Sequence, residues 1–190
     1  MADETIAPEH PKTTPKKRLI VINGSDNRNG LTHQCLLSVA HKLAHDHHLE
    51  IEYFFLQSEP PSAQFTQYHQ LLGLIVDGQT GRILIGSPTY FGGATPKLIN
   101  FFSFLRKTWL KNGKGGDAFR NRIVHLHSNG FSSGTDLTIA FMQRACEALG
   151  FTIEGFGTTE YNLLWKDNRI RYGLRSDEAC AIDVSLSVDD

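Results

Sequence analysis

The sequence has few of the features that mark membrane, nucleic-acid-binding or disulfide-rich proteins. No apolar run in its 190 residues approaches the roughly 20 that cross a bilayer. Acidic and basic side chains nearly balance at a net charge of −1, which gives no electrostatic reason to expect nucleic acid or an acidic membrane as a partner. The cysteines lack CxxC spacing, so we expect free thiols in a reducing compartment; they are Cys35, Cys146 and Cys180.

The amino-terminal stretch also lacks the apolar core of a signal peptide. Residues 1–17 are rich in proline, threonine and charge, and we interpret them as a disordered tail. Without an export signal or a membrane span, we expect a cytoplasmic protein. The remaining residues, 18–190, suffice for one domain with a substantial core.

After the tail, short apolar runs alternate with helical patterns. The apolar runs predict strands at 18–24, 50–56, 82–87, 122–128 and 152–157. Apolar residues at helical spacing predict helices at 32–45, 65–77 and 137–149, a helix after Thr95 as N-cap, and a weaker one after Ser176. The stretch between the second strand and its helix, PPSAQ, reads as a break. This alternation is typical of a parallel sheet covered by helices on both faces.

The strand order follows from the position of the glycine-rich turns. Five strands with one such turn after the first favour the flavodoxin-like order 2-1-3-4-5, a three-layer α/β sandwich. Three unusual loops follow the first, third and fourth strands, which are neighbours in this order. We therefore expect these loops to converge at the carboxyl edge of the sheet, where ligands of such folds bind.

The first loop, NGSDNRNGLT at 23–32, joins a strand to a helix. Backbone N–H groups at a helix N-terminus, together with hydroxyl donors, form a pocket for an anion. The glycine spacing fits neither a Walker A loop nor GxGxxG, so a phosphate monoester is favoured over a dinucleotide. The alternative is a plain turn rich in glycine and asparagine. The candidate residues are Ser25, Asn27, Arg28, Gly30, Leu31 and Thr32.

The second loop, SPTYFGG at 87–93, combines aromatic residues with glycines. Glycine lets the backbone approach a ligand closely, and the aromatic rings supply flat apolar surface. The alternative is that the aromatic side chains cap the core. The candidate residues are Pro88, Thr89, Tyr90, Phe91 and Gly92.

The third loop, HSNGFSSGTD at 127–136, is small and polar around one aromatic residue. Its backbone could hydrogen-bond the edge of a heteroaromatic ring while Phe131 covers the face; a plain surface loop is the alternative. Its candidate residues are Ser128, Asn129, Gly130, Phe131 and Gly134. Taken together, the loops predict a site for flavin mononucleotide (FMN), with phosphate on the first loop and the isoalloxazine ring between the other two.

Three segments resemble motifs of the NADPH-dependent FMN reductase family. GSDNRNGLT resembles its phosphate loop GSxRxxGxT, GSPTYFGGATPKLINF resembles SPxYxGxxxxxLKxFxD, and the third loop with its helix is similar to GGxxGGxExTLxxLxxxLxxxGM. Asn27 stands at the family's arginine position, Asp136 at its glutamate, and Ser103 at its acidic residue after the second motif. The resemblance covers roughly residues 18–160.

The resemblance implies a flavodoxin-like oxidoreductase with bound FMN. It implies that electrons pass from NADPH or NADH to a quinone, a flavin or another small acceptor. The cofactor performs this chemistry, so no side chain is expected to be catalytic. It also implies a homodimer or homotetramer. Two other functions stay open: a flavodoxin-type electron carrier, which the near-neutral charge disfavours, and an interaction module that has lost its cofactor.

The histidines suggest a metal site but do not complete one. His41 and His45 are one helical turn apart, yet no cysteine or carboxylate completes a ligand set, so no metal is predicted. His127 borders the third loop and could contact the cofactor; packing or a structural hydrogen bond is the alternative.

Overall fold

The computed structural model describes residues 16–58, 61–111, 119–131, 134–161 and 168–174. Its elements, in chain order, are β1 Arg18–Asn23, α1 Leu31–His47, β2 Glu50–Phe55, α2 Pro61–Val76, β3 Thr80–Pro88, α3 Pro96–Lys111, β4 Ile123–Phe131, α5 Thr135–Ala148, β5 Thr152–Tyr161 and β6 Asn168–Leu174. Most of the expected tail and the expected helix after Ser176 lie outside the described residues. No helix among the described residues is long and apolar enough to cross a bilayer.

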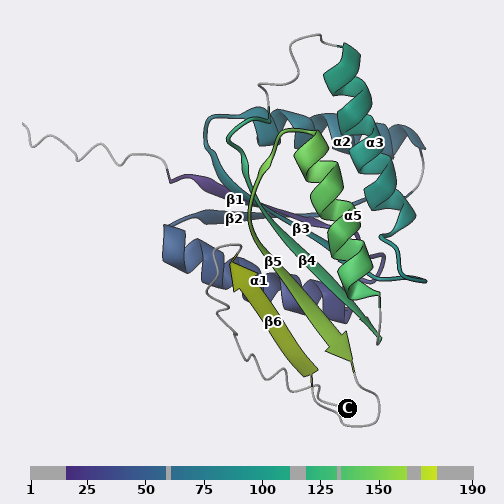
Figure 1. Ribbon diagram of the computed structural model, residues 1–190. Coiled ribbons are helices and arrows are strands. Elements are labelled where there is room, and N and C mark those ends of the chain that lie inside the picture. Colours follow the sequence, from purple (N-terminus) through teal and green to yellow (C-terminus); the bar gives the residue numbers. More distant parts are fainter. Residues whose placement is uncertain (1–15, 59–60, 112–118, 132–133, 162–167, 175–190) are drawn as a thin grey trace, which may run out of the picture.

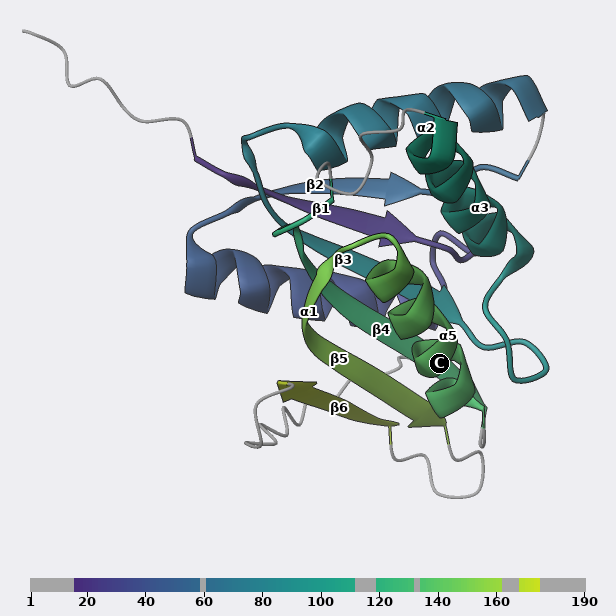
Figure 2. The same ribbon diagram turned by 45° about the horizontal axis from the view of Figure 1, so that its top comes forward.

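The sheet has the order β2-β1-β3-β4-β5-β6 (Figures 1 and 2). The first five strands pair in parallel, as the sequence predicts. The sixth strand, β6, was not predicted; it runs antiparallel along β5, with Gly155 opposite Leu174 and Tyr161 opposite Asn168. Alternation of Ile170 with charged neighbours is the period-two signal that could have identified it.

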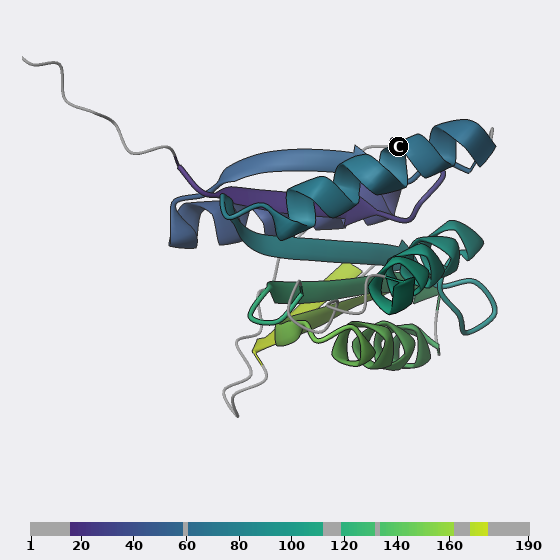
Figure 3. The ribbon, with the colours of Figure 1, turned by 90° about the horizontal axis from the view of Figure 1, so that it is seen from above.

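Helices cover both faces of the sheet. Along β1, Leu19 and Val21 pack in a core cluster with side chains of α1, whereas Ile20 and Ile22 belong to the larger cluster with α2, α3 and α5. This division follows from the alternation of side chains along a strand. Figure 3 shows α2, α3 and α5 in that order across the sheet. Because β1, β3 and β4 run parallel, their carboxyl ends lie at the same edge of the sheet.

Helix α2 starts earlier than the sequence predicts, whereas α3 starts at Pro96, directly after Thr95 as predicted, but lacks one expected contact. Helix α2 begins at Pro61, four residues before the predicted start, because a proline in the first turn lacks an N–H that would have no partner there. Thr95 precedes α3, and its carbonyl accepts the N–H groups of Leu98 and Ile99. Its hydroxyl, however, is buried and makes no hydrogen bond within the described residues, so the expected capping bond is absent.

Helix α1 packs closely on β3 because Gly86 has no side chain. An added Cβ at Gly86 would lie 2.4 Å from Leu36 Cδ2 and 2.5 Å from its Cδ1. Both residues are in the protein interior, and Leu36 is fully buried. A glycine at this point of β3 therefore sets how near α1 lies to the sheet.

We expect Gly86→Ala to destabilise the protein by about 1–3 kcal/mol through overpacking. The matched control is Gly73→Ala in α2, where an added Cβ meets nothing within 4 Å. That change should stabilise by about 0.5–1 kcal/mol because alanine is the better helix former. Urea unfolding of both variants provides the measurement. Equal stability of the two variants would show that α1 does not depend on the gap at Gly86.

Candidate functional site

The three loops singled out in the sequence meet at the carboxyl edge of the sheet. They leave β1, β3 and β4, which are adjacent in the sheet. In the register of the strands, Asn23 lies opposite Gly86 and Pro88 lies opposite Asn129. The predicted convergence of the loops is confirmed.

The first loop is folded by its own side chains. The N–H of Ser25 donates to Asn23 Oδ1 at 2.8 Å, that of Asn27 to Ser25 Oγ at 3.2 Å, and that of Asn29 to Asn27 Oδ1 at 3.0 Å. Such side-chain bonds to a backbone group two residues on are typical of tight polar turns. They fix the path of the chain from β1 into α1.

The loop leads into α1, and no side chain caps the N-terminus of this helix. Gly30 precedes α1 with φ −77° and ψ 169°, and no side chain caps the helix that begins at Leu31. The first N–H groups of a helix have no partner within it and carry a partial positive charge, so they suit an anion. Arg28 adds a cation nearby; its guanidinium carbon lies 5.4 Å from the centroid of the Phe55 ring. Asn27 and Arg28 are both exposed.

A hydrogen bond joins the first loop to the third. Thr32 Oγ1 donates to Asn129 Oδ1 at 2.6 Å, and both residues are buried. The hydroxyl proton of Thr32 is thus directed at Asn129, although the sequence suggested a phosphate as its acceptor. Ser25 is equally buried at 4% exposure.

The second and third loops are joined through Thr89. Its N–H donates to the Asn129 carbonyl at 2.7 Å, and its hydroxyl lies 2.8 Å from Ser128 Oγ and donates to Thr138 Oγ1 at 3.0 Å. Glycines make this approach possible: a Cβ at Gly130 would lie 3.0 Å from Thr89 Cβ. Pro88, just before Thr89, is buried at the end of β3.

The tip of the second loop is a tight hairpin with exposed aromatic residues. The backbones of Tyr90 and Gly93 exchange two hydrogen bonds of 3.0 Å. Phe91 and Gly92, between them, have φ values of 50° and 75°, as in a type I′ turn. Tyr90 is 53% exposed and Phe91 is fully exposed, so the alternative that these rings cap the core is wrong.

The hairpin tip rests on the third loop. A Cβ at Gly134, whose φ is 121°, would lie 3.0 Å from Gly92 Cα. Phe131 ends β4, where its backbone pairs with Tyr161 of β5. The backbone of Gly134 therefore packs directly against that of Gly92, beside the start of α5.

One residue of the site was missed by the sequence analysis. Lys97 in the first turn of α3 is 6% exposed, and its ammonium group donates to the carbonyls of Leu56 at 2.8 Å and Ser25 at 3.2 Å. It also forms an ion pair with Asp26. A single lysine thus holds the first loop to the end of β2 and to α3. No spacing in the sequence marks this lysine, because its partners are distant along the chain.

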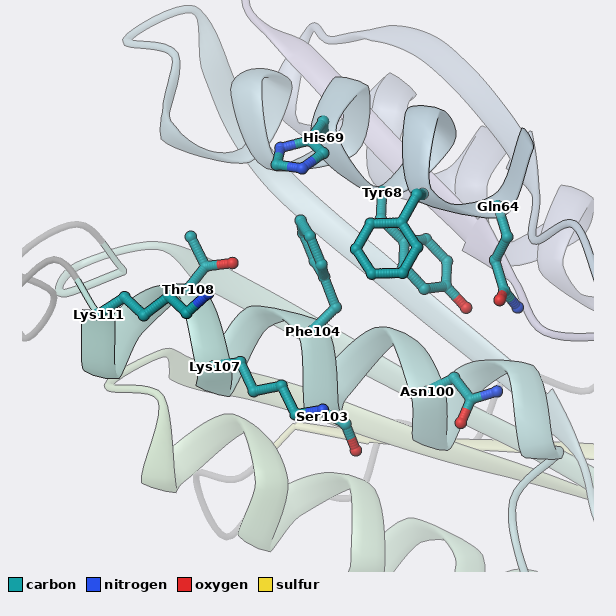
Figure 4. Close-up of a pocket in the computed structure, with 10 residues that line it drawn as sticks. Gln64, Tyr68, His69, Asn100, Ser103, Phe104, Lys107, Thr108 and Lys111 are labelled. Carbon is teal, nitrogen blue, oxygen red and sulfur yellow. The ribbon is translucent and has the colours of Figure 1, made fainter. Parts of the chain in front are cut away.

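A separate groove of about 550 Å³ lies between α2 and α3 (Figure 4). Aromatic rings line it, with Phe65 and Phe104 edge to face at 5.9 Å and His69 and Phe104 at 4.9 Å. Ser103, which replaces the family's acidic residue, faces this groove. None of the groove's lining residues belongs to the three loops.

His127, which borders the third loop, lies inside the protein. His127 is fully buried, and its Nε2 lies 3.2 Å from Thr159 Oγ1. Burial lowers the pKa of His127 to about 4, so the ring is neutral at neutral pH. Within the described part of the chain, no group of three histidine, cysteine or acidic side chains could hold a metal ion.

We expect stability to fall as the pH drops from about 6.5 to 4. The unfolded chain protonates His127 near its ordinary pKa of about 6.5, whereas the folded protein keeps the ring neutral to about pH 4. The unfolded state therefore binds more protons in this window, and the free energy of unfolding loses about 1.4 kcal/mol per pH unit. The free energy of unfolding, measured by urea unfolding at several pH values, should fall less steeply with decreasing pH in His127→Gln. In the control His45→Gln, at a side chain 90% exposed, its dependence on pH should not change. An unchanged slope in His127→Gln would contradict this.

Fold and site together define a flavodoxin-like α/β protein with a cluster of loops at the carboxyl edge of its sheet. The chain belongs to the NADPH-dependent FMN reductase family, whose model matches residues 17–154. That membership supports an FMN-dependent oxidoreductase. Among curated proteins, none matches the chain significantly.

Solved structures share the fold at low sequence identity. The Trp repressor binding protein from Bacillus subtilis is 17% identical with a TM-score of 0.61, over 76% of this chain and 88% of its own. An apo NADH:FMN oxidoreductase is 12% identical with a TM-score of 0.59, over 76% and 75%. A flavone reductase is 16% identical with a TM-score of 0.57, over 79% and 57%. At such identities the likeness concerns the fold alone.

Proposed function

We propose that this chain binds FMN at the three loops and is an oxidoreductase that takes electrons from NADPH or NADH. The observation that carries the proposal is the joining of the loops through Asn129, beside an uncapped helix N-terminus. The first loop would hold the phosphate through the N–H groups at Leu31 and Thr32, with Arg28 as a nearby cation. Ser25, Asn27 and Gly30 shape that pocket.

The second and third loops would hold the isoalloxazine ring. The glycines at 92 and 134 let these two loops approach each other closely, since a Cβ at Gly134 would lie 3.0 Å from Gly92 Cα. Thr89, Tyr90 and Phe91 would border the ring on one side, with Pro88 holding the start of that loop. Ser128 to Phe131, the last residues of β4, would flank the edge of the ring; their backbones also pair with β5. The residues present therefore fit FMN.

FMN, when bound, would supply the hydride-accepting and electron-donating chemistry. The protein's residues would bind it, orient it and leave one face open to the nicotinamide and then to a small acceptor such as a quinone or another flavin. No side chain is assigned a catalytic role. Backbone N–H groups directed at the ring's pyrimidine edge would stabilise the negative charge that develops there on reduction.

A homodimer or homotetramer in the cytoplasm is part of this proposal. Apolar side chains are exposed beside the loops: Phe91 fully, Leu137 at 65% and Phe141 at 38%. They adjoin one another, because a Cβ at Gly92 would lie 3.6 Å from Leu137 Cδ1, and Leu137 and Phe141 are one turn apart on α5. An apolar surface beside a binding site is suited to a second subunit that helps to enclose the ligand.

We expect the purified protein to be yellow and to release FMN on heating. The first loop enters α1 directly, so it provides for one phosphate and for no adenosine half. Chromatography of the released flavin against FMN and FAD standards decides the cofactor, and FAD as the main species would contradict the proposal. The flavin absorption band should bleach with NADPH or NADH in the absence of oxygen.

The same preparation separates the remaining functions. Steady-state oxidation of NAD(P)H with added quinone is expected of the enzyme. A flavin-containing protein that catalyses no such oxidation would instead be an electron carrier. A colourless protein that takes up no added FMN would be an interaction module.

We expect Gly92→Val to lose most of its bound FMN while staying folded. The φ of 75° at Gly92 is strained for a β-branched residue, so the hairpin tip must shift away from its place against Gly134. Gly78→Val is the matched control, since it lies just before β3 at the opposite end of that strand, with nothing within 4 Å of an added Cβ. Flavin content per chain and far-UV circular dichroism are measured for both. A folded Gly92→Val protein with full flavin content would show that this loop is only a connection.

A further inference from the structure

Lys97 is almost entirely withdrawn from water, which is unusual for a lysine. Its side chain is 6% exposed, although that of its carboxylate partner, Asp26, is 68% exposed. Lysines are seldom buried unless their charge is paired and hydrogen-bonded. The carbonyls of Ser25 and Leu56 complete its set of acceptors. All three of its N–H groups thus have a partner.

The backbone of Lys97 is also anchored. Tyr68 of α2, itself 2% exposed, donates its hydroxyl hydrogen to the Lys97 carbonyl at 2.9 Å. Figure 4 shows Tyr68 deep in the groove between α2 and α3. With its backbone held by α2 and its ammonium group held by the first loop, Lys97 has a fixed position.

This contact fixes the orientation of one peptide group in the first loop. In a trans peptide the carbonyl and the following N–H point in opposite directions. Because the Ser25 carbonyl is directed at Lys97, the N–H of Asp26 points to the opposite side of the loop. Lys97 therefore turns a backbone donor away from the protein interior.

Lys97 also pairs with the negative charge of Asp26 in the first loop. Asp26 lies between β1 and the N-terminus of α1, within the loop that would surround the phosphate. A carboxylate without a cation would repel a phosphate dianion there. The ion pair with Lys97 reduces that repulsion.

We propose that Lys97 is a positioning residue that makes the site select a phosphorylated flavin over the same flavin without phosphate. This rests on the proposed function, because it assumes that the first loop holds the phosphate of FMN. Lys97 orients the Ser25–Asp26 peptide and neutralises Asp26. It would act through the first loop and not at the ring or the reacting atoms.

The test measures dissociation constants of FMN and of riboflavin, which lacks the phosphate, by fluorescence titration of flavin-free protein. In Lys97→Met, FMN affinity should fall about tenfold or more, the equivalent of losing one charge-assisted hydrogen bond. Riboflavin affinity should stay within about twofold, so the preference for FMN shrinks. Lys107→Met is the matched control, since Lys107 is an exposed lysine of the same helix that lines the groove; it should retain the full preference.

Lys97→Arg tests whether a conservative change keeps the preference for FMN. It also provides a second test if Lys97→Met does not fold. Arginine keeps the charge and several donors, so it should retain most of the preference for FMN. Equal loss of affinity for both flavins in Lys97→Met, or no loss for either, would overturn the role given to Lys97. So would a folded Lys97→Arg protein without any preference for FMN. If the unaltered protein binds neither flavin, the proposed function itself fails, and this inference with it.

Discussion

The candidate site depends on Asn129, which connects loops that leave three different strands. Its side chain accepts the Thr32 hydroxyl and its carbonyl accepts the Thr89 N–H. Because β3 lies between β1 and β4, the bond to Thr32 bridges the end of β3. It can form because α1 lies close to the sheet: Leu36, one helical turn after Thr32, occupies the space over Gly86. The hydrogen bond between Thr32 and Asn129 therefore depends on the absence of a side chain at Gly86.

The fold could be predicted where local pattern and burial agree. Continuous apolar runs such as 18–24 lie in strands covered on both faces, and α3 begins at Pro96, directly after Thr95 as predicted. The prediction failed where one residue type allows two structures. Pro61 lies in a stretch that reads as a break, although a proline suits a first helical turn as well as a loop. Strand β6 is an edge strand in which a single apolar residue, Ile170, between two arginines gives only a short alternation pattern.

The convergence of the three loops could be predicted, but the contacts among them could not. Glycines and small polar residues after buried strands indicate loops at the carboxyl edge, and the strand order brings those loops together. The sequence does not reveal the direction in which individual side chains point. Thr32 is directed at Asn129, the Thr95 hydroxyl makes no capping bond, and Lys97 lies beneath the first loop. These orientations follow from residues far away in the chain, which local patterns do not contain.

The two sides of the site are held by different forces. Buried polar contacts at Ser25, Thr32 and Asn129 are strong because water is excluded from them, so the proposed phosphate side is shaped before any ligand binds. The tip of the second loop is held by one backbone bridge, while Phe91 adopts a left-handed conformation that costs about 1–3 kcal/mol and exposes its ring fully. Under the proposed function, the fixed side would hold the phosphorylated end of FMN. The strained aromatic tip would then meet what covers the ring, whether a substrate or a second subunit.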